Sequence, residues 1–241
     1  MDMKIFVAEL LGTFMLILLG NGVVANVNLN KSGMKGGGSV QITFAWGLAV
    51  LLPAFIFGPA SGAHLNPALT IAFAVSGDIG WNLVPTYLLG EMLGAFLGAV
   101  LVYLLFKDQF DATDDVATQR GAFSTAPSVK HTGRNLLSEI VGTFVLVFAI
   151  YGSGNVGAAA GVSQLLVFGV IVSIGMSLGG LTGYAINPAR DLGPRIAYAI
   201  LPFENKDPDW GYAWIPVVGP IIGGIIAALL KGAMLNIGIF G

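Results

Sequence analysis

The chain has 241 residues, of which 55% are hydrophobic and only 10% are charged, and its mean hydropathy is +0.82. Because an average soluble domain is about 25% charged, this composition excludes an ordinary soluble enzyme and a disordered chain. The net charge of -2 provides no basic surface for nucleic acid. The absence of cysteine excludes disulfides, thiol catalysis and thiolate metal sites, and two histidines are too few for a His-rich metal site. The composition therefore predicts an integral membrane protein.

Six apolar runs are long enough, or nearly so, to cross a bilayer, which takes about 20 residues. Two further apolar stretches, at about 67–76 and 188–201, are too short to span and would cover half of the hydrocarbon core as helices. The segment 107–134 is the only long polar connection and is predicted to be a loop. The six predicted spans lie at about 5–25, 40–58, 84–106, 136–153, 163–180 and 214–236.

The sequence repeats itself. AELLGTF at 8–14 matches SEIVGTF at 138–144, and SGAHLNPALT at 61–70 matches TGYAINPARD at 182–191. A weaker third match pairs GEMLGAFLGA at 90–99 with VGPIIGGIIAA at 218–228, in the same order along the chain. We therefore predict a single domain over 1–241 with two halves, about 1–106 and 135–241, joined by 107–134. Since each half has three spans, the second half must enter from the opposite side, which makes an inverted repeat.

The triplet Asn-Pro-Ala opens both short apolar stretches, at Asn66 and at Asn187. Asn is a favoured N-cap, and Pro is favoured at the first helical position. Each triplet therefore predicts a half-helix, and inverted topology brings the two N-termini together near the bilayer centre. Their positive dipole ends would oppose cations there, and the Asn amides could donate hydrogen bonds to a passing oxygen.

The backbone just before each half-helix must be non-helical at membrane depth, which is tolerated only inside protein or along a watery cavity. We expect its carbonyls to form a row of acceptors along a pore. The alternative is that the triplets only cap two buried helices, but their matched repeat positions favour the pore. The carbonyls predicted to line it belong to Gly62, Ala63, His64, Leu65, Gly183, Ala185 and Ile186.

With these motifs the sequence resembles the aquaporin family, also called major intrinsic proteins, over nearly its whole length. The resemblance implies an all-α hourglass fold with six transmembrane helices and two re-entrant half-helices. It further implies a homotetramer with one pore per subunit, embedded in the lipid bilayer, and passive conduction without cofactor or catalysis.

The resemblance places the narrow outer selectivity filter at Trp46, Gly175, Tyr184 and Arg190. Water-selective members are similar but carry His where Gly175 stands, so we expect Gly175 to leave open space. Trp46 and Tyr184 would offer an apolar corner to a carbon backbone, and Arg190 would offer donors to hydroxyls. This amphipathic slot suits a linear polyol.

The residues Asp191, Arg195 and Pro216-Val217 resemble the glycerol branch of the family, whereas Tyr184 stands where that branch usually has Phe. The predicted function is a passive channel for glycerol and other small uncharged solutes, with water, that excludes ions and protons. Dihydroxyacetone, urea, hydrogen peroxide and undissociated lactic acid are further candidate solutes. The alternatives are a water-selective aquaporin and, in a different class, a coupled secondary transporter.

Acids inside apolar spans suggest function by default, including proton relay. Glu9 and Glu139 occupy matched repeat positions, so we expect them instead to anchor the re-entrant loops by accepting backbone N–H groups. Asp191 is expected to anchor a loop as well, with Arg190 pointing into the pore because adjacent helical residues diverge. The His64 side chain could be a proton-binding gate, but packing beside its loop is the preferred interpretation.

The resemblance implies cytoplasmic termini in a cell (plasma) membrane, and the short loops suggest a bacterial one. The count of basic residues points the other way, because cytoplasmic loops usually carry the excess of Lys and Arg. In the implied orientation only Lys4 and Lys231 would face the cytoplasm. The outer side would carry Lys31, Lys35, Lys107, Arg120, Lys130, Arg134 and Lys206.

Overall fold

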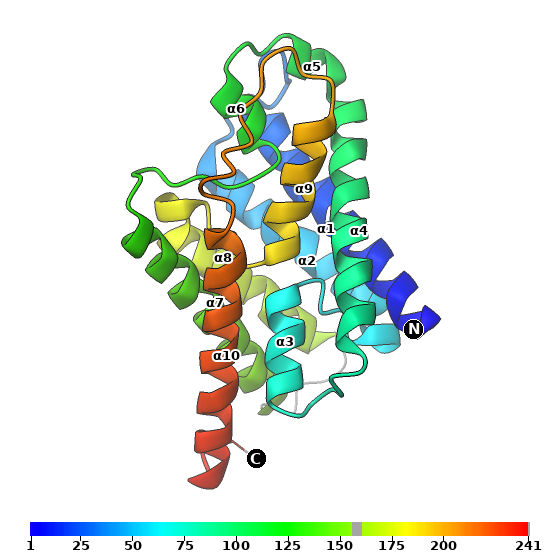
Figure 1. Cartoon of the computed structure of the whole chain (residues 1–241), viewed down its shortest axis with the longest axis vertical. Helices are drawn as coiled ribbons and strands as arrows, with labels where there is room; N and C mark the ends of the chain where they lie inside the picture. Colours follow the sequence, from blue (N-terminus) through cyan, green and yellow to red (C-terminus); the bar gives the residue numbers. More distant parts are fainter. Residues whose placement is uncertain (156–160, 241) are drawn as a thin grey trace.

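In the computed structural model, which describes residues 1–155 and 161–240, all the regular structure of the described chain is helical (Figure 1). Six helices are long and apolar enough to cross a membrane, which confirms the six predicted spans. These are α1 (Met3–Asn28), α2 (Gly38–Ser61), α4 (Val84–Leu105), α7 (Thr132–Asn155), α8 (Val162–Thr182) and α10 (Ile215–Asn236).

The two short apolar stretches form the half-helices α3 (Pro67–Val75) and α9 (Pro188–Ile200). The predicted loop 107–134 is wrong in part, because it contains the short helices α5 (Lys107–Asp111) and α6 (Val116–Gly121). A local cap explains α6: the Asp115 carboxylate accepts a hydrogen bond from the backbone N–H of Thr118 at 2.7 Å.

The helices pack in corresponding pairs in the two halves. α1 packs on α4 and α2, and α7 packs in the same way on α10 and α8. Each half-helix lies against a span of the other half, with α3 on α10 and α9 on α4. The two sets of contacts therefore interlock, and neither half-helix is held by its own repeat alone.

Glycines permit the closest of these helix contacts. A Cβ added at Gly94 would lie 2.2 Å from the carbonyl oxygen of Leu10, and one at Gly223 would lie 2.3 Å from that of Ile140. Real Cβ atoms do not approach so closely, so α4 on α1 and α10 on α7 both require glycine here. Small residues at helix interfaces are the usual means of close packing in membranes.

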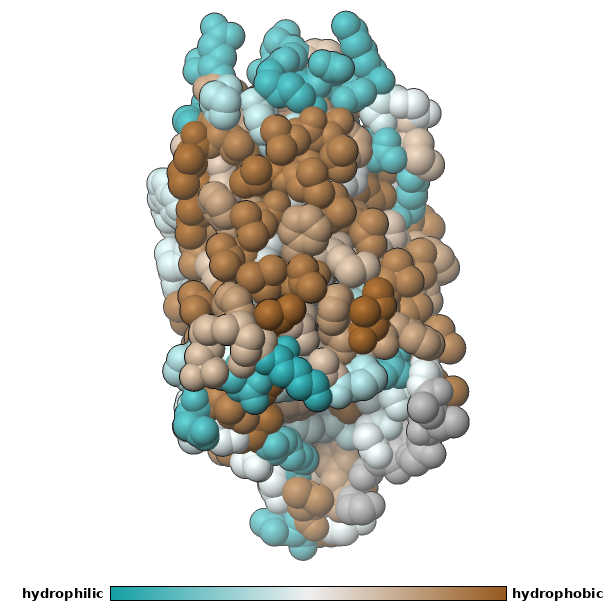
Figure 2. Space-filling model, turned by 90° about the vertical axis from the view of Figure 1, so that its right-hand side faces the viewer, coloured by the Kyte–Doolittle hydropathy of each residue, from teal (hydrophilic) through white to brown (hydrophobic). Residues whose placement is uncertain are grey.

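The surface matches a bilayer. Figure 2 shows a broad hydrophobic band between two more hydrophilic ends. The chain termini and the end of α3 lie toward one end of the molecule, and α5 and α6 lie at the other (Figure 1). An even number of spans returns the chain to the side on which it started, which agrees with this arrangement.

Candidate functional site: the passage between the half-helices

The half-helices α3 and α9 point their N-termini at each other inside the molecule (Figure 1). The Oδ1 atom of Asn66 caps α3 by accepting from the N–H of Ala68 at 2.9 Å, and Asn187 caps α9 through Ala189 at 3.0 Å. Each Asn then reaches across to the other loop. Nδ2 of Asn66 donates to the carbonyl of Ile186, and Nδ2 of Asn187 donates to that of Leu65, both at 2.8 Å.

Both re-entrant loops are built from left-handed backbone. Gly62 ends α2 with φ +87°, and Gly183 ends α8 with φ +80°. Four non-glycine residues follow with positive φ, two in each loop: Ala63, Leu65, Tyr184 and Ile186. Such backbone costs about 1–2 kcal/mol per residue for L-amino acids, so the surrounding contacts must hold it in place.

The buried carboxylates supply those contacts. Glu9 accepts the N–H groups of His64 at 3.0 Å and Leu65 at 2.7 Å. Glu139 accepts those of Ala185 at 3.0 Å and Ile186 at 2.8 Å. These hydrogen bonds turn the loop N–H groups away from the passage and toward α1 and α7. They are the contacts that a loop anchor would make.

A cavity of about 230 Å³ runs along the two loops. Three of the four predicted filter residues, Trp46, Tyr184 and Arg190, line it together with both capping Asn residues. Phe73, Ile150 and Ser153 line it as well. The seven residues whose carbonyls were predicted to face a pore also line it, namely Gly62, Ala63, His64, Leu65, Gly183, Ala185 and Ile186.

Two of the seven carbonyls already have a protein partner. The carbonyls of Leu65 and Ile186 accept from the Asn amides across the junction. The sequence did not anticipate this use, because backbone acceptors carry no residue-type signal. One N–H of each Asn amide is used in this way, and the second bonds to none of the described residues.

The Arg190 side chain is fixed by contacts that the sequence did not predict. Its guanidinium lies 4.3 Å from the centre of the Trp46 ring, and its Nη1 donates to the carbonyl of Phe123 at 3.1 Å. Asn21 donates to the same carbonyl at 3.0 Å from within α1. A polar Asn in an apolar span was the available signal for this contact. Trp46 itself lies against Gly20, where an added Cβ would come within 2.2 Å of the ring.

The expectation of open space beside Gly175 is wrong. An added Cβ would lie 2.5 Å from Cγ2 of Thr43 and 2.9 Å from Cζ of Tyr184. A Cβ added at Gly179, one turn along α8, would also lie 2.7 Å from Cδ1 of the Tyr184 ring. Gly175 does not line the cavity among the described residues, so its effect on the width of the passage is to let Tyr184 lie back against α8.

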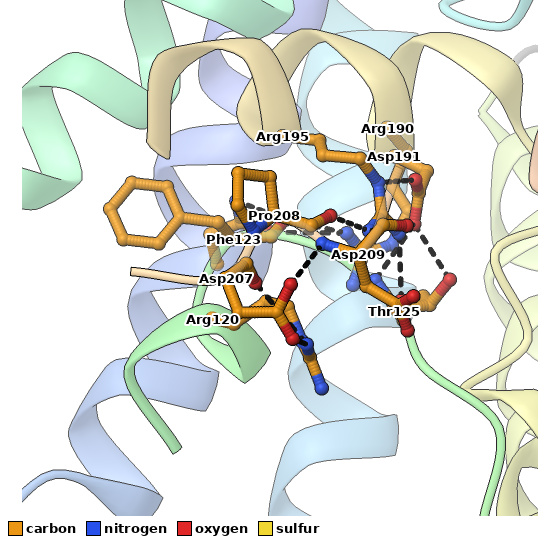
Figure 3. A network of polar contacts seen from close by, with 10 residues as sticks. Arg120, Phe123, Thr125, Arg190, Asp191, Arg195, Asp207, Pro208 and Asp209 are labelled. Atoms are coloured by element: carbon orange, nitrogen blue, oxygen red, sulfur yellow. Dashed lines mark hydrogen bonds and ion pairs between the residues drawn. The ribbon is translucent and has the colours of Figure 1, made fainter. Parts of the chain in front are cut away.

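Asp191 pairs with Arg195 and not with its neighbour Arg190. Both side chains of the pair are fully buried, and Nε of Arg195 lies 2.8 Å from Oδ1 of Asp191 (Figure 3). Asp191 also accepts from the backbone N–H and the hydroxyl of Thr125, each at 2.7 Å. Arg195 donates to the carbonyls of Thr125 and Pro208. The pair thereby holds the segment that carries the Phe123 carbonyl, and through it the position of Arg190.

Fold and site together define a class: a six-span membrane protein whose two half-helices meet at an internal passage. The model of the major intrinsic protein family matches residues 1–231. The chain therefore belongs to the major intrinsic protein family.

Relatives in this family are similar over almost the whole chain. The chain is 52% identical over 229 residues to a probable glycerol uptake facilitator protein of Thermotoga maritima, covering 95% of this chain and 98% of the relative. It is 51% identical over 223 residues to the glycerol uptake facilitator protein of Bacillus subtilis, covering 92% and 81%. The solved structure of the aquaglyceroporin from Plasmodium falciparum superposes with a TM-score of 0.83 at 30% identity, covering 98% of each chain.

Proposed function

We propose that this protein is a passive channel for glycerol and other small uncharged solutes, with water. The observation that carries the proposal is the two-sided lining of the passage. Trp46 and Tyr184 present rings, whereas Arg190 and the two capping Asn residues present N–H donors. A polyol has a carbon edge and a hydroxyl edge, so both sides of the lining find a partner. The names of the relatives support the same solute.

Ion exclusion follows from the same geometry. The N-termini of α3 and α9 place partial positive charge where the two loops meet, and Arg190 adds a full charge nearby. A cation in the passage would lose its hydration while facing positive groups, which is the barrier expected of aquaporin-type pores. Neutral solutes meet no such barrier. The selectivity filter is accordingly proposed at Trp46, Tyr184 and Arg190, with Gly175 acting from behind Tyr184.

The direct test is stopped-flow light scattering of proteoliposomes in a glycerol gradient and in an impermeant osmolyte. We expect glycerol flux well above that of protein-free vesicles and linear in concentration. Fast water flux with glycerol at the protein-free level would instead assign a water-selective channel. Dihydroxyacetone, urea, hydrogen peroxide and lactic acid at low pH can then be ranked in the same vesicles.

A coupled secondary transporter is the alternative from another class, since inverted repeats also build such proteins. It needs an acid free to bind a coupling ion. Glu9 and Glu139 are each occupied by two backbone N–H groups and a hydroxyl. No Asp or Glu lines the cavity among the described residues. Saturable uptake that collapses with a proton ionophore would favour the transporter, and we expect neither behaviour.

We further propose a homotetramer in a bacterial plasma membrane with both termini in the cytoplasm. The apolar outer faces of the spans and the bacterial relatives support this placement. Native mass spectrometry of the detergent-solubilised protein tests the tetramer. Protease added to intact cells tests the orientation, because the 107–134 segment should then be cut from outside. Cleavage only after lysis would reverse the orientation.

A further inference from the structure

Three buried polar side chains of the first half have no like counterpart in the second. They line up as a chain from α4 through α3 to the first re-entrant loop, and they are Glu91, Thr70 and His64. At the matched positions the second half has Pro220, Asp191 and Ala185. The match of Glu91 to Pro220 follows from the glycine before each, because Gly90 lies on Glu9 just as Gly219 lies on Glu139.

The Thr70 hydroxyl lies between the other two side chains. Its Oγ1 is 2.7 Å from Oε1 of Glu91 and 2.9 Å from Nδ1 of His64. A hydroxyl has one proton to donate, so it can donate to one of these neighbours and must accept from the other. The direction of this relay decides which ring nitrogen of His64 carries a proton.

The backbone fixes that direction. The N–H of Asn66 donates to the same Oε1 of Glu91 at 3.2 Å, so this oxygen is an acceptor. The Thr70 hydroxyl donates to this oxygen, and the second carboxyl oxygen, Oε2, is buried and bonds to none of the described residues. With its one proton directed at Glu91, Thr70 can only accept from His64, so the Nδ1–H of His64 donates to Thr70.

The rest of the imidazole packs among aromatic rings. The ring is stacked on Tyr87 at 4.2 Å and meets the edge of Phe73 at 4.9 Å, and only 5% of the residue is exposed. A charged imidazolium in this setting would need a second acceptor at Nε2. Nε2 bonds to none of the described residues, yet it is not sealed in protein, and His64 lines the cavity.

We propose that Glu91, acting through Thr70, holds His64 with its proton on Nδ1, so that Nε2 is a fixed hydrogen-bond acceptor for a solute hydroxyl in the passage. Glu91 and Thr70 are positioning residues in this arrangement, and His64 is the contact. The inference rests on the proposed passage of hydroxylated solutes. It adds a side-chain acceptor on one side of the junction, beside the donor of Asn66, whereas Ala185 offers none on the other.

The tautomer can be observed directly, because the chain has only two histidines, His64 and His131. A His131→Gln background removes the second, which is exposed and does not line the cavity. In proteoliposomes with ¹⁵N-labelled histidine, solid-state NMR at neutral pH should show a protonated Nδ1 and an unprotonated Nε2. A protonated Nε2 in this background would overturn the proposal.

Two variants separate a relay from simple packing. Glu91→Leu removes the acceptor of Thr70, so the Thr70 hydroxyl should turn to Nδ1 and the proton should move to Nε2. Thr70→Val removes the link and should leave a mixture of the two tautomers, while Thr70→Ser should keep the original spectrum. An unchanged spectrum in a folded Glu91→Leu or Thr70→Val variant would overturn the proposal.

Flux supplies the functional measurement. Losing one solute hydrogen bond should lower glycerol permeability about twofold to tenfold in Thr70→Val and in His64→Ala, with Thr70→Ser near the parent value. Unchanged glycerol flux in His64→Ala would show that Nε2 does not serve the solute. If the parent protein conducts no glycerol at all, the proposed function fails, whereas the NMR spectrum still decides whether the relay exists.

Discussion

The first re-entrant segment, 62–75, and the second, 183–200, adopt nearly the same backbone but carry different side chains. The capping residues Asn66 and Asn187 have φ/ψ of -158°/112° and -158°/111°. Each loop is held by one buried Glu that accepts two successive N–H groups. Beyond this shared frame the segments diverge: the first is bonded to the Glu91 side chain of α4, whereas the second contains a buried ion pair, Asp191 with Arg195, that bonds to Thr125.

This comparison distinguishes the residues that build the passage from those proposed to select the solute. The residues that match between the halves place two helix N-termini opposite each other, and both halves need the same contacts to do so. The unmatched side chains that line the cavity include Tyr184 and Arg190 of the second segment and His64 of the first, and these are the positions at which we propose that solutes are discriminated. Changes to matched residues should therefore act alike in both halves, and changes to unmatched residues should act in one half only.

The largest loss of stability is expected when the matched loop anchors, Glu9 and Glu139, are replaced. Glu9→Ala and Glu139→Ala each leave two buried N–H groups and one hydroxyl without an acceptor, at about 1–3 kcal/mol for each stranded donor. We expect a loss of about 3–9 kcal/mol in either variant, which is enough to prevent accumulation of folded protein. Thermal unfolding in detergent measures it, and Glu→Gln at each site should be milder. A large difference between the two sites would contradict the equivalence of the halves.

The next largest loss of stability is expected for a residue that only the second half carries, Arg195. Arg195→Ala leaves Asp191 charged and fully buried, and breaking a buried pair in this way typically costs about 3–5 kcal/mol. It should also loosen the 122–125 segment and with it the Phe123 carbonyl that holds Arg190. A folded variant should therefore leak ions.

The matched control for that variant is Arg120→Ala, which removes a more exposed ion pair of the same loops. Electrical recordings in planar bilayers should show ion current for Arg195→Ala and none for Arg120→Ala. Equal stability of the two variants would show that the buried pair does not hold the loops around Thr125 and Pro208.

A smaller loss of stability and of glycerol flux should distinguish two glycines at matched positions, Gly58 in α2 and Gly179 in α8. At Gly179 an added Cβ would lie 2.7 Å from the Tyr184 ring, whereas at Gly58 the nearest atom, of Gln164, is 3.7 Å away. Gly179→Ala should cost about 1–3 kcal/mol by overpacking and should push Tyr184 toward the passage. Glycerol flux should then fall more than water flux, and Gly58→Ala should leave both unchanged. Equal losses of the two fluxes in Gly179→Ala would remove Tyr184 from the filter.

The sequence predicts the features that depend on repetition and local rules, and it misses those that depend on rotamers and backbone acceptors. The spans and half-helices are set by apolar length and by Asn-Pro signals, so they could be found in advance. The partner of Arg190 is the backbone carbonyl of Phe123. Every residue has such a carbonyl, so the residue type gives no signal for this contact. The space over Gly175 is filled because the left-handed backbone of Tyr184 aims its ring at α8, a direction that spacing cannot supply.

The smallest loss of stability is expected for two ion pairs, each of which holds the loop that follows a half-helix. After α9, Asp207 accepts from Arg120 at 2.7 Å, and after α3, Asp78 pairs with Lys231 at the same distance. Both ties are partly exposed, so each is worth about 0–1 kcal/mol. Asp207→Asn and Asp78→Asn should therefore lower thermal stability slightly and to a similar degree.

The stabilisation by the Asp207–Arg120 ion pair should decrease at low pH. The N–H of Asp209, and then the charge of Arg120, hold the pKa of Asp207 below its ordinary value of 3.8. A lowered folded pKa means that the carboxylate stabilises the protein above the ordinary value, and that this contribution is lost as pH falls through the lowered one. The melting difference between the parent and Asp207→Asn should persist from pH 7 down to the ordinary value of 3.8 and close only as the pH falls below it. A melting difference that stays constant at low pH would show that the charge of Asp207 does not contribute to the stability of the protein.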